Sequence, residues 1–235
     1  GTMLIDLHVH TLKSADSSLS PEDLVREARR VGLDAVCLTE HGGGWDRHDF
    51  ERLASRYDML LIPALEVDTD MGHIAVFGAD GYAPGMSKAR DLRRIVDASG
   101  GFMVVTHPFR RMFDRAAGRN LLFPDADGQT MTARQAAEHP VFQLVDDVEV
   151  GNGANTLREN DLAREVADAL GKRGTGGSDA HSTHGLGCFV TSFERNVRCV
   201  ADLVEELRAG RYTPAQGLLQ GKLRPLTTDG HKALA

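Results

Sequence analysis

The chain has 235 residues, of which 41% are hydrophobic and 26% are charged, a balance typical of an ordinary globular protein. Its formal net charge of −7 argues against nucleic-acid binding driven by bulk positive charge. No apolar run approaches the roughly 20 residues of a membrane span. The three dispersed cysteines do not suggest a disulfide framework, so we expect a cytoplasmic protein with no membrane partner.

Segments typical of strands and of helices alternate along the chain. The first helix has the clearest boundaries, because Ser20 suits the N-cap, Pro21 the first helical position and Gly32 the C-terminal stop. The expected strands are 3–9, 35–41, 60–67, 73–79, 102–108, 146–152, 175–181 and 187–193. The expected helices are 20–32, 49–58, 88–101, 132–140, 156–174 and 200–210.

This alternation predicts an α/β fold with a mostly parallel sheet and helices outside it, either open or closed into a barrel. Gly1 and Thr2 look like a cloning remnant before Met3. No repeat or linker divides the rest, so we expect one domain over 3–235, with 211–235 as a C-terminal extension. The polar stretch 110–131 is the candidate for a specificity lid.

Side chains that can bind metals gather at the ends of the predicted strands. His8 and His10 share one face of the first strand because they are two residues apart. Imidazole with carboxylate suits Zn, Mn or Fe, and ligands of α/β folds collect at the carboxyl ends of strands. One ion uses about four to six ligands, so a larger set predicts two or three ions. The candidates are His8, His10, Asp16, His41, Glu66, His73, His107, Asp179 and His181.

The motifs "DLHVHT", "TEHGG", "ALEV", "GH", "THP" and "GGSDAHS" occur in this order between Met3 and about Gly210. Together they resemble the PHP (polymerase and histidinol phosphatase) family of metal-dependent phosphoesterases. The resemblance implies a distorted (β/α)7-type barrel with its metal site at the C-terminal ends of the strands. The implied ligands are His8, His10, Glu66 and Asp179 for a first ion, Glu66, His73 and His107 for a second, and Asp16, His41 and His181 for a third.

The resemblance also implies a reaction, in which a hydroxide bridging two metal ions attacks a small phosphomonoester or nucleotide. The expected substrates are nucleotides, sugar phosphates or histidinol phosphate, with short oligonucleotides as a further option. We assign Asp179 to catalysis through metal position, His184 to protonation of the leaving group and Arg110 to a bidentate clasp on phosphate. The alternative is that His184 and Arg110 are solvated loop residues, as expected for most of the arginines at 111, 115 and 119.

Several residues keep two interpretations. Glu149 and Asn152 end a strand on the same side of the fold as the ligands, where they either orient substrate or metal ligands or make ordinary hydrogen bonds. Trp45 either stacks on a base or sugar or covers the rim of the site. Three histidines without a strand-end context are expected at the surface: His48, His139 and His231.

Two rival functions stay open. Amidohydrolases also begin with a paired-histidine strand and end with a metal-binding aspartate. That interpretation leaves Asp16, Glu66, His73 and His181 unexplained, and no lysine falls at a strand end to form a carbamylated bridge. The other alternative is a non-catalytic, metal-stabilised PHP module, although an inactive copy would be expected to have lost ligands.

Overall fold

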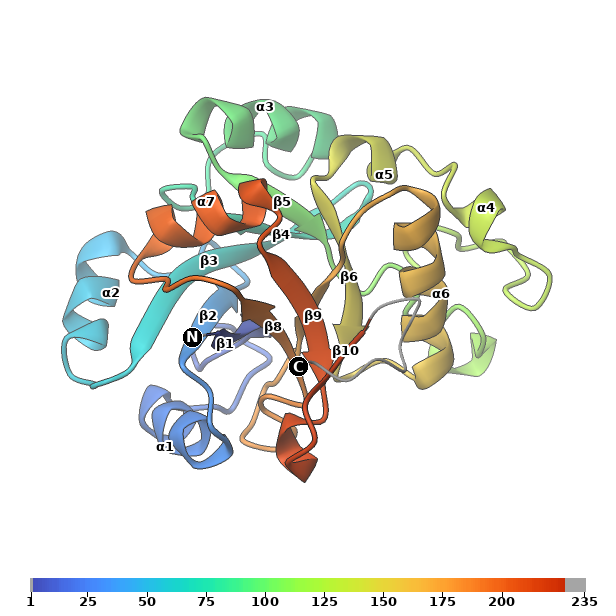
Figure 1. Cartoon of the computed structure of the whole chain (residues 1–235). Coiled ribbons are helices and arrows are strands. Elements are labelled where there is room, and N and C mark those ends of the chain that lie inside the picture. The colour runs from blue at the N-terminus through green and yellow to red at the C-terminus, as the bar shows by residue number, and fades with distance from the viewer. Residues whose placement is uncertain (1, 227–235) are drawn as a thin grey trace.

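The structure, a computed structural model, describes residues 2–226. One ten-stranded sheet in the order β10-β9-β8-β1-β2-β3-β4-β5-β6-β7 curls around the core, and helices lie outside it (Figure 1). The strands are β1 (Met3–Val9), β2 (Ala35–Glu40), β3 (Leu60–Thr69), β4 (Gly72–Phe77), β5 (Phe102–Val105), β6 (Asp147–Asn152), β7 (Thr175–Gly177), β8 (Phe189–Phe193), β9 (Tyr212–Gln216) and β10 (Arg224–Pro225). The helices are α1 (Pro21–Val31), α2 (Arg47–Ala54), α3 (Ala89–Ser99), α4 (Ala133–Ala136), α5 (Val141–Leu144), α6 (Leu157–Ala169) and α7 (Val200–Ala209).

The strand β4 runs against its neighbours. β1, β2 and β3 are mutually parallel, as are β5, β6 and β7, whereas β4 pairs antiparallel with both β3 and β5. The sheet is therefore less parallel than expected. The reason is the short connection between β3 and β4, which consists only of Asp70 and Met71. Two residues can form a hairpin but not the crossover that a parallel pair needs. As a result, β4 begins at the end of the barrel where its neighbours finish.

The barrel closes where β1 meets two different segments along one edge. Its first half pairs with β8, with Met3 opposite Phe193. Its second half meets the segment after β7, where the Asp179 amide donates to the His8 carbonyl at 2.7 Å and the His10 amide donates to the Ala180 carbonyl at 3.0 Å. β1 to β7 therefore form the distorted (β/α)7-type barrel predicted from the sequence.

A β-bulge in β1 brings its histidines to the barrel interior. Between Asp6 and Val9, which pair with Val36 and Leu38, β1 has one residue more than β2. In a regular strand His8 would point away from the side of Leu7. The extra residue lets Leu7 pack in the core while His8 still reaches Glu66 of β3, with His8 Nε2 3.2 Å from a Glu66 oxygen.

The carboxylate of Asp6 holds this bulge in place. It is fully buried and accepts hydrogen bonds from the amides of His8 at 3.1 Å, Ser178 at 2.9 Å and Gly187 at 3.0 Å. Burial raises the pKa of Asp6 to about 6, and the donors oppose this shift. One side chain thus joins β1, the segment after β7 and the turn before β8.

Apolar residues from the strands fill the interior away from the histidines. Ile5, Ile62, Phe102 and Phe193 belong to one buried cluster, against which Leu203 of α7 packs. The helix α1 forms as predicted: the Ser20 hydroxyl accepts from the Asp23 amide at 3.1 Å, and Gly32 ends the helix in the left-handed region with φ 92°. In the described chain, no helix combines the length and the hydropathy of a membrane span.

The structure differs from the prediction around Pro140 and near the C-terminus. α4 is shorter than the expected 132–140, and the short helix α5 begins directly after Pro140, which we had expected to end a helix. Val141 and Phe142 of α5 are buried in the core, so tertiary packing stabilises a segment with little helical signal of its own. β9 and β10 were not predicted, although β9 pairs with β8 along its full length.

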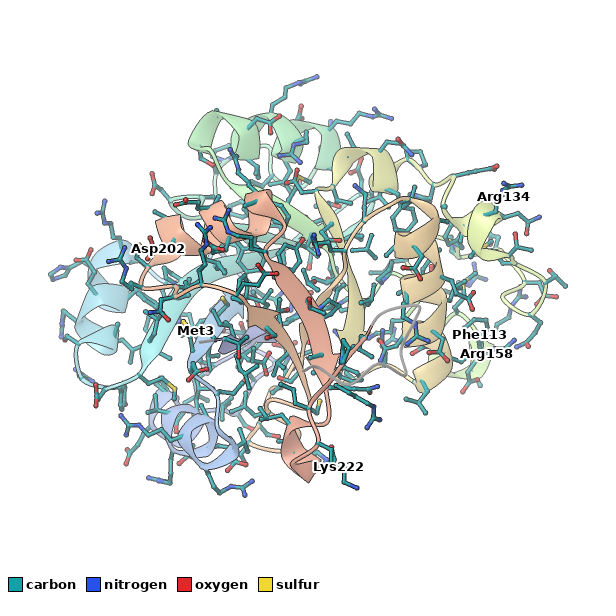
Figure 2. The ribbon with its side chains drawn as sticks, viewed as in Figure 1. Met3, Phe113, Arg134, Arg158, Asp202 and Lys222 are labelled. Atoms are coloured by element: carbon teal, nitrogen blue, oxygen red, sulfur yellow. The ribbon has the colours of Figure 1, made fainter. Side chains whose placement is uncertain are left out.

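The segment 110–131 is folded onto the barrel. Its Asn120 is buried, and the Asn120 amide group donates to the carbonyls of Pro108 at 2.8 Å and Arg110 at 2.9 Å. Arg158 of α6 lies over the ring of Phe113 at 4.0 Å from its centroid (Figure 2). The segment is thus held at two places, by the hydrogen bonds of Asn120 and by the contact of Phe113 with α6.

Candidate metal centre

The nine predicted ligands meet at one end of the barrel. His8 and His10 lie at the end of β1, His41 follows β2, and His107 follows β5. His73 reaches the same end from the start of β4 because that strand is reversed. Eight of the nine form three groups, and within each group the ligand atoms lie within 4.8 Å of one another. The ninth, Asp16, contacts His181, a member of one of these groups.

The first group consists of His8, His10, Glu66 and Asp179, and all four are buried. The Nε2 atoms of His8 and His10 each lie 3.2 Å from an oxygen of Glu66 and 3.2 Å from Oδ1 of Asp179. Neither Nε2 atom has a hydrogen-bond partner within the described chain. Buried nitrogens that converge on carboxylates without hydrogen bonds fit a divalent ion with mixed imidazole and carboxylate ligands.

The second group consists of Glu66, His73 and His107. Nε2 of His107 lies 3.1 Å from Oε2 of Glu66, and the Thr106 hydroxyl donates to the same oxygen at 2.7 Å. Sequence reasoning missed Asp68, which lies two residues beyond Glu66 on β3 with Oδ1 3.2 Å from Nε2 of His73. Its same-face spacing from Glu66 was the signal that could have indicated it.

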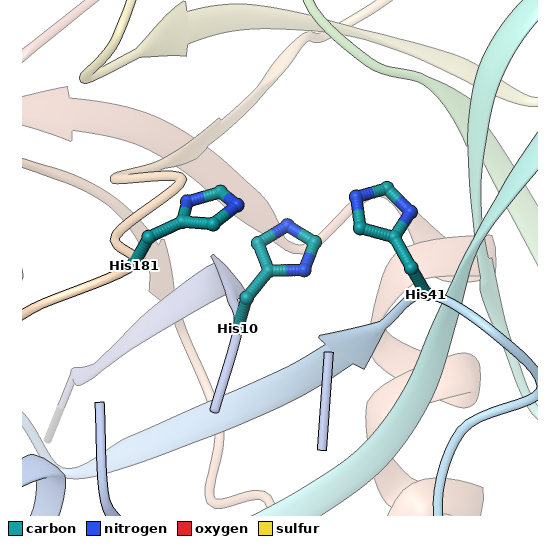
Figure 3. Close-up of side chains that lie close together, drawn as sticks. All are labelled: His10, His41 and His181. Atoms are coloured by element: carbon teal, nitrogen blue, oxygen red, sulfur yellow. The ribbon is translucent and has the colours of Figure 1, made fainter. Parts of the chain in front are cut away.

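The third group consists of His10, His41 and His181, which come from the ends of β1 and β2 and from the segment after β7 (Figure 3). The ring of His10 lies between the other two, with centroids 4.6 Å from His41 and 4.3 Å from His181. Oδ2 of Asp16 lies 3.1 Å from Nε2 of His181. His10 therefore belongs to two groups, whereas the resemblance implied only the first.

Strand-end carboxylates orient the histidines. Oε2 of Glu149 lies 2.6 Å from Nδ1 of His8, so a proton on Nδ1 leaves Nε2 free to face the first group. The other oxygen of Glu149 accepts from the His107 amide at 2.9 Å and from the Asn152 amide group at 2.7 Å. Of the two interpretations of Glu149 and Asn152, the geometry favours the one in which they orient metal ligands.

The backbone is strained at two of the candidate ligands. His107 and Asp179 have positive φ angles of 27° and 57°, a region that residues other than glycine rarely adopt. Such conformations persist where the surrounding structure requires them, and they are common at functional sites. Here they direct Asp179 into the first group and His107 into the second, which share Glu66.

Charges within the cluster set its protonation when no ion is bound. Burial disfavours the charged form of His10, but the Asp179 and Glu66 carboxylates outweigh this effect and raise the pKa of His10 to about 9. Burial alone would raise the pKa of Glu66, yet the imidazoles of His8, His10 and His107 hold that pKa well below its usual range. A divalent ion at this cluster would therefore have to displace protons from the imidazoles.

Arg110 contacts the first group. Its Nη2 donates to Oδ2 of Asp179 at 2.7 Å and to Oδ1 of Asn152 at 2.9 Å, and its Nε donates to Oδ1 of Asn155 at 3.2 Å. Arg110 also lines a depression of about 240 Å³ beside His73 and His107. Two further arginines, Arg111 and Arg119, and the apolar side chains of Leu121 and Leu122 line the same depression.

The remaining predicted residues lie outside the three groups. His184 is exposed, and its ring makes no hydrogen bond to a candidate ligand in the described chain. The indole N–H of Trp45 donates to Glu40 at 2.7 Å, which agrees with a covering role. His48 is exposed as predicted, but His139 is half-buried between Phe123 and Phe142, so its assignment to the surface was wrong. His231 lies outside the described residues.

Family models match most of the chain. The model described as "PHP domain" matches residues 6–128, just over half of the chain, and the model described as "PHP-associated" matches residues 158–212. Protein MJ1587 of Methanocaldococcus jannaschii is 25% identical over 137 residues, which is 54% of this chain and 79% of that protein.

Three solved structures share the fold. One is a Bifidobacterium adolescentis protein proposed to be a metal-dependent phosphoesterase, with a TM-score of 0.58, 16% identity, and coverage of 87% of this chain and 95% of that one. An amidohydrolase from Chromobacterium violaceum has a TM-score of 0.59 and 16% identity, with coverage of 88% and 96%. The lesion-specific endonuclease PfuEndoQ from Pyrococcus furiosus has a TM-score of 0.58 and 15% identity, with coverage of 89% and 56%.

Proposed function

The chain belongs to the PHP family, and on this premise we propose that it is a metal-dependent phosphoesterase that hydrolyses a small phosphomonoester or nucleotide. The observation that carries the proposal is the first group: two buried imidazole nitrogens without hydrogen bonds converge on two buried carboxylates. The neighbouring groups supply enough donors for a second and a third divalent ion of Zn, Mn or Fe.

When bound, divalent ions supply Lewis acidity and lower the pKa of a coordinated water toward neutrality. The chain's own residues position this chemistry. The imidazoles of His8 and His10 are held deep in the barrel, and Glu66 lies between the first and second groups. The three arginines of the adjacent depression favour an anionic substrate, and its leucines can contact the organic part of a small ester.

His184 is proposed to protonate the leaving group from the exposed rim after Asp179 and His181. The segment 110–131 is proposed to select the substrate, since it carries Arg119, Leu121 and Leu122 into the depression. Nucleotides, sugar phosphates and histidinol phosphate remain the proposed substrates, with short oligonucleotides as a further class. The endonuclease among the structural neighbours makes oligonucleotides worth testing.

An amidohydrolase is the second candidate function, because a protein so described shares the fold. The site of this chain favours the phosphoesterase. The lysines of the described residues 2–226 (Lys13, Lys88, Lys172 and Lys222) all lie outside the strands, and an arginine-lined depression lies directly beside His73 and His107. A carboxylate-rich site without a carbamylated lysine and with guanidinium groups at its edge suits phosphate better than an amide carbonyl.

We expect the purified chain to bind two or three equivalents of divalent metal and to hydrolyse phosphomonoesters once loaded. Metal-free protein is reconstituted separately with Mn, Fe and Zn, its metal content is measured by elemental analysis, and phosphate release is followed for each proposed substrate class. Amide and lactone substrates are assayed in parallel. One equivalent or fewer at saturation would exclude the multinuclear site, and amide hydrolysis without phosphate release would favour the amidohydrolase.

Substitution of Arg110 tests how phosphate is held. A lysine keeps the charge but cannot reproduce the planar guanidinium, which contacts Asp179 and Asn152 through Nη2 and Asn155 through Nε and also lines the depression. We expect Arg110→Lys to lower kcat/KM by an amount corresponding to about 1–3 kcal/mol, the range for charge-assisted hydrogen bonds. Arg110→Ala should cost at least as much.

Arg115 is the matched control for Arg110, since it lies in the same segment and donates to the Ala126 carbonyl instead. The variant Arg115→Lys should keep kcat/KM within about twofold of the unsubstituted protein. All variants are compared at equal metal content. If both Arg110 variants were also near-neutral, the metal ions alone would hold the phosphate and the clasp would be dismissed.

A further inference from the structure

We propose that Glu40 is a positioning residue for the metal ligands, acting through Ser14 on His10 and His41. This role presupposes the metal-dependent function proposed above. Glu40 is the last residue of β2 and directly precedes His41. It is not itself a member of any ligand group, although its side chain is fully buried beside them. A buried carboxylate in this place calls for an explanation, since burying a charge without compensation is costly.

Four donors converge on the carboxylate of Glu40. Oε1 accepts from the Thr11 amide at 2.8 Å and from the Ser14 hydroxyl at 2.9 Å. Oε2 accepts from the Thr11 hydroxyl and from the indole N–H of Trp45 at 2.7 Å. Three of these donors belong to the loop that follows β1, so Glu40 ties that loop to the end of β2.

Ser14 connects Glu40 to two candidate ligands, His10 and His41. Its hydroxyl has one proton, which it donates to Glu40, so its oxygen can only accept from its other neighbours. Those neighbours are the backbone amide of His41 at 3.0 Å and Nδ1 of His10 at 3.5 Å. A proton on Nδ1 of His10 leaves Nε2 unprotonated, and Nε2 is the atom that lies 3.2 Å from both Glu66 and Asp179.

The loop held by Glu40 also carries Asp16 toward His181. On its far side, the Ser17 hydroxyl donates to the His10 carbonyl at 2.7 Å, and the Ser18 amide donates to the His181 carbonyl at 3.0 Å. The loop is therefore clamped between Glu40 and the segment after β7. This clamp sets the separation of Asp16, His10 and His41, which come from two different strands and the loop between them.

A merely structural role for Glu40 would predict lower stability with unchanged metal binding, so two variants separate the roles. Glu40→Gln keeps the shape but replaces one acceptor oxygen with a donor that faces other donors. Ser14→Ala removes only the link to His10 and His41 and leaves three donors on Glu40. Trp45→Phe is the control, since it also removes one donor from Glu40 but leaves the Ser14 link intact.

We expect Glu40→Gln and Ser14→Ala to weaken Zn²⁺ binding about 10–100-fold, the usual effect of losing a partner that orients a ligand. Trp45→Phe should leave the affinity within about threefold. Zn²⁺ affinity is measured by competition with a chelator, and melting temperature is recorded alongside. Unchanged affinity in Ser14→Ala would overturn the proposal, and Ser14→Ala keeps it testable even if Glu40→Gln fails to fold.

A second readout is independent of both activity and stability. Nitrogen-15 spectra of histidine-labelled, zinc-loaded protein report which ring nitrogen of His10 keeps its proton. We expect Nδ1 to be protonated in the unsubstituted protein and the signal to change in Ser14→Ala but not in Trp45→Phe. An unchanged His10 signal in Ser14→Ala would overturn the proposal that Glu40 acts on His10 through Ser14. Tight Zn²⁺ binding without phosphate release would instead refute only the phosphoesterase function.

Discussion

Asp179→Asn is expected to lower the turnover of the metal-loaded protein by on the order of 10³-fold or more while leaving the fold intact. Oδ1 of Asp179 lies 3.2 Å from Nε2 of both His8 and His10, so it closes the first group. An asparagine has the same shape but no charge, and its amide nitrogen cannot ligate an ion. Asparagine also tolerates the left-handed backbone of this position, with φ 57°, so the strain should be accommodated.

The measurement for Asp179→Asn is kcat on the best phosphoester found, with metal content determined on the same sample and circular dichroism as a check on folding. Asp161→Asn is a matched control, since Asp161 is an exposed aspartate on α6 that pairs with Arg164 at 2.9 Å. Near-unchanged turnover of Asp179→Asn with full metal loading would show that the first group is assigned wrongly.

His10→Ala is expected to abolish measurable turnover and to remove about one equivalent of metal, the ion of the first group. His10 lies in both the first and the third group, but with Nδ1 protonated toward Ser14 its one free nitrogen, Nε2, can ligate a single ion, so the substitution removes the donor that faces Glu66 and Asp179. Its ring also lies between His41 and His181, and its loss leaves a gap between them (Figure 3). Elemental analysis of the reconstituted variant, with kcat measured in parallel, tests this expectation.

His48→Ala is the matched histidine control, because His48 is exposed on α2 and belongs to no ligand group of the described chain. It should keep both the metal content and the turnover of the unsubstituted protein. If His10→Ala lost a single equivalent and His41→Ala lost the same one, His10 would serve the third group alone. A variant with full metal content would contradict both assignments.

Local rules account for the elements that the sequence predicted well. β1 occupies residues 3–9 as expected, and α1 begins at Pro21 after the Ser20 cap and ends before Gly32. The grouping of strand-end side chains also follows from chain order alone, because parallel strands deliver their carboxyl ends to one place. Binding of metal by these side chains stays a prediction for the experiments above.

Features that depend on tertiary pairing were not predictable from the sequence. The bulge between Asp6 and Val9 exists only relative to β2, so no local pattern in "IDLHVHT" reveals it. The sharing of His10 between two groups depends on where β2 and the segment after β7 come to lie. Arg110 was expected at the phosphate, but its contacts with Asp179 and Asn152 follow from the meeting of the loops after β5, β6 and β7.

One edge of β1 pairs with two different segments, and this affects how the chain folds. The contact that completes this edge joins Asp6 to Ser178, which are 172 residues apart in the sequence. Contacts of such long range form late, because a large loop must be closed before they stabilise anything. During synthesis β1 is made well before both segments that pair with this edge, so the edge stays unpaired until the segment after β7 and β8 have been made. An ion held by His8, His10 and Asp179 would need this edge to be paired first, because Asp179 lies in the segment that pairs with β1, and until then the unpaired edge is where newly made copies are most prone to pair with one another.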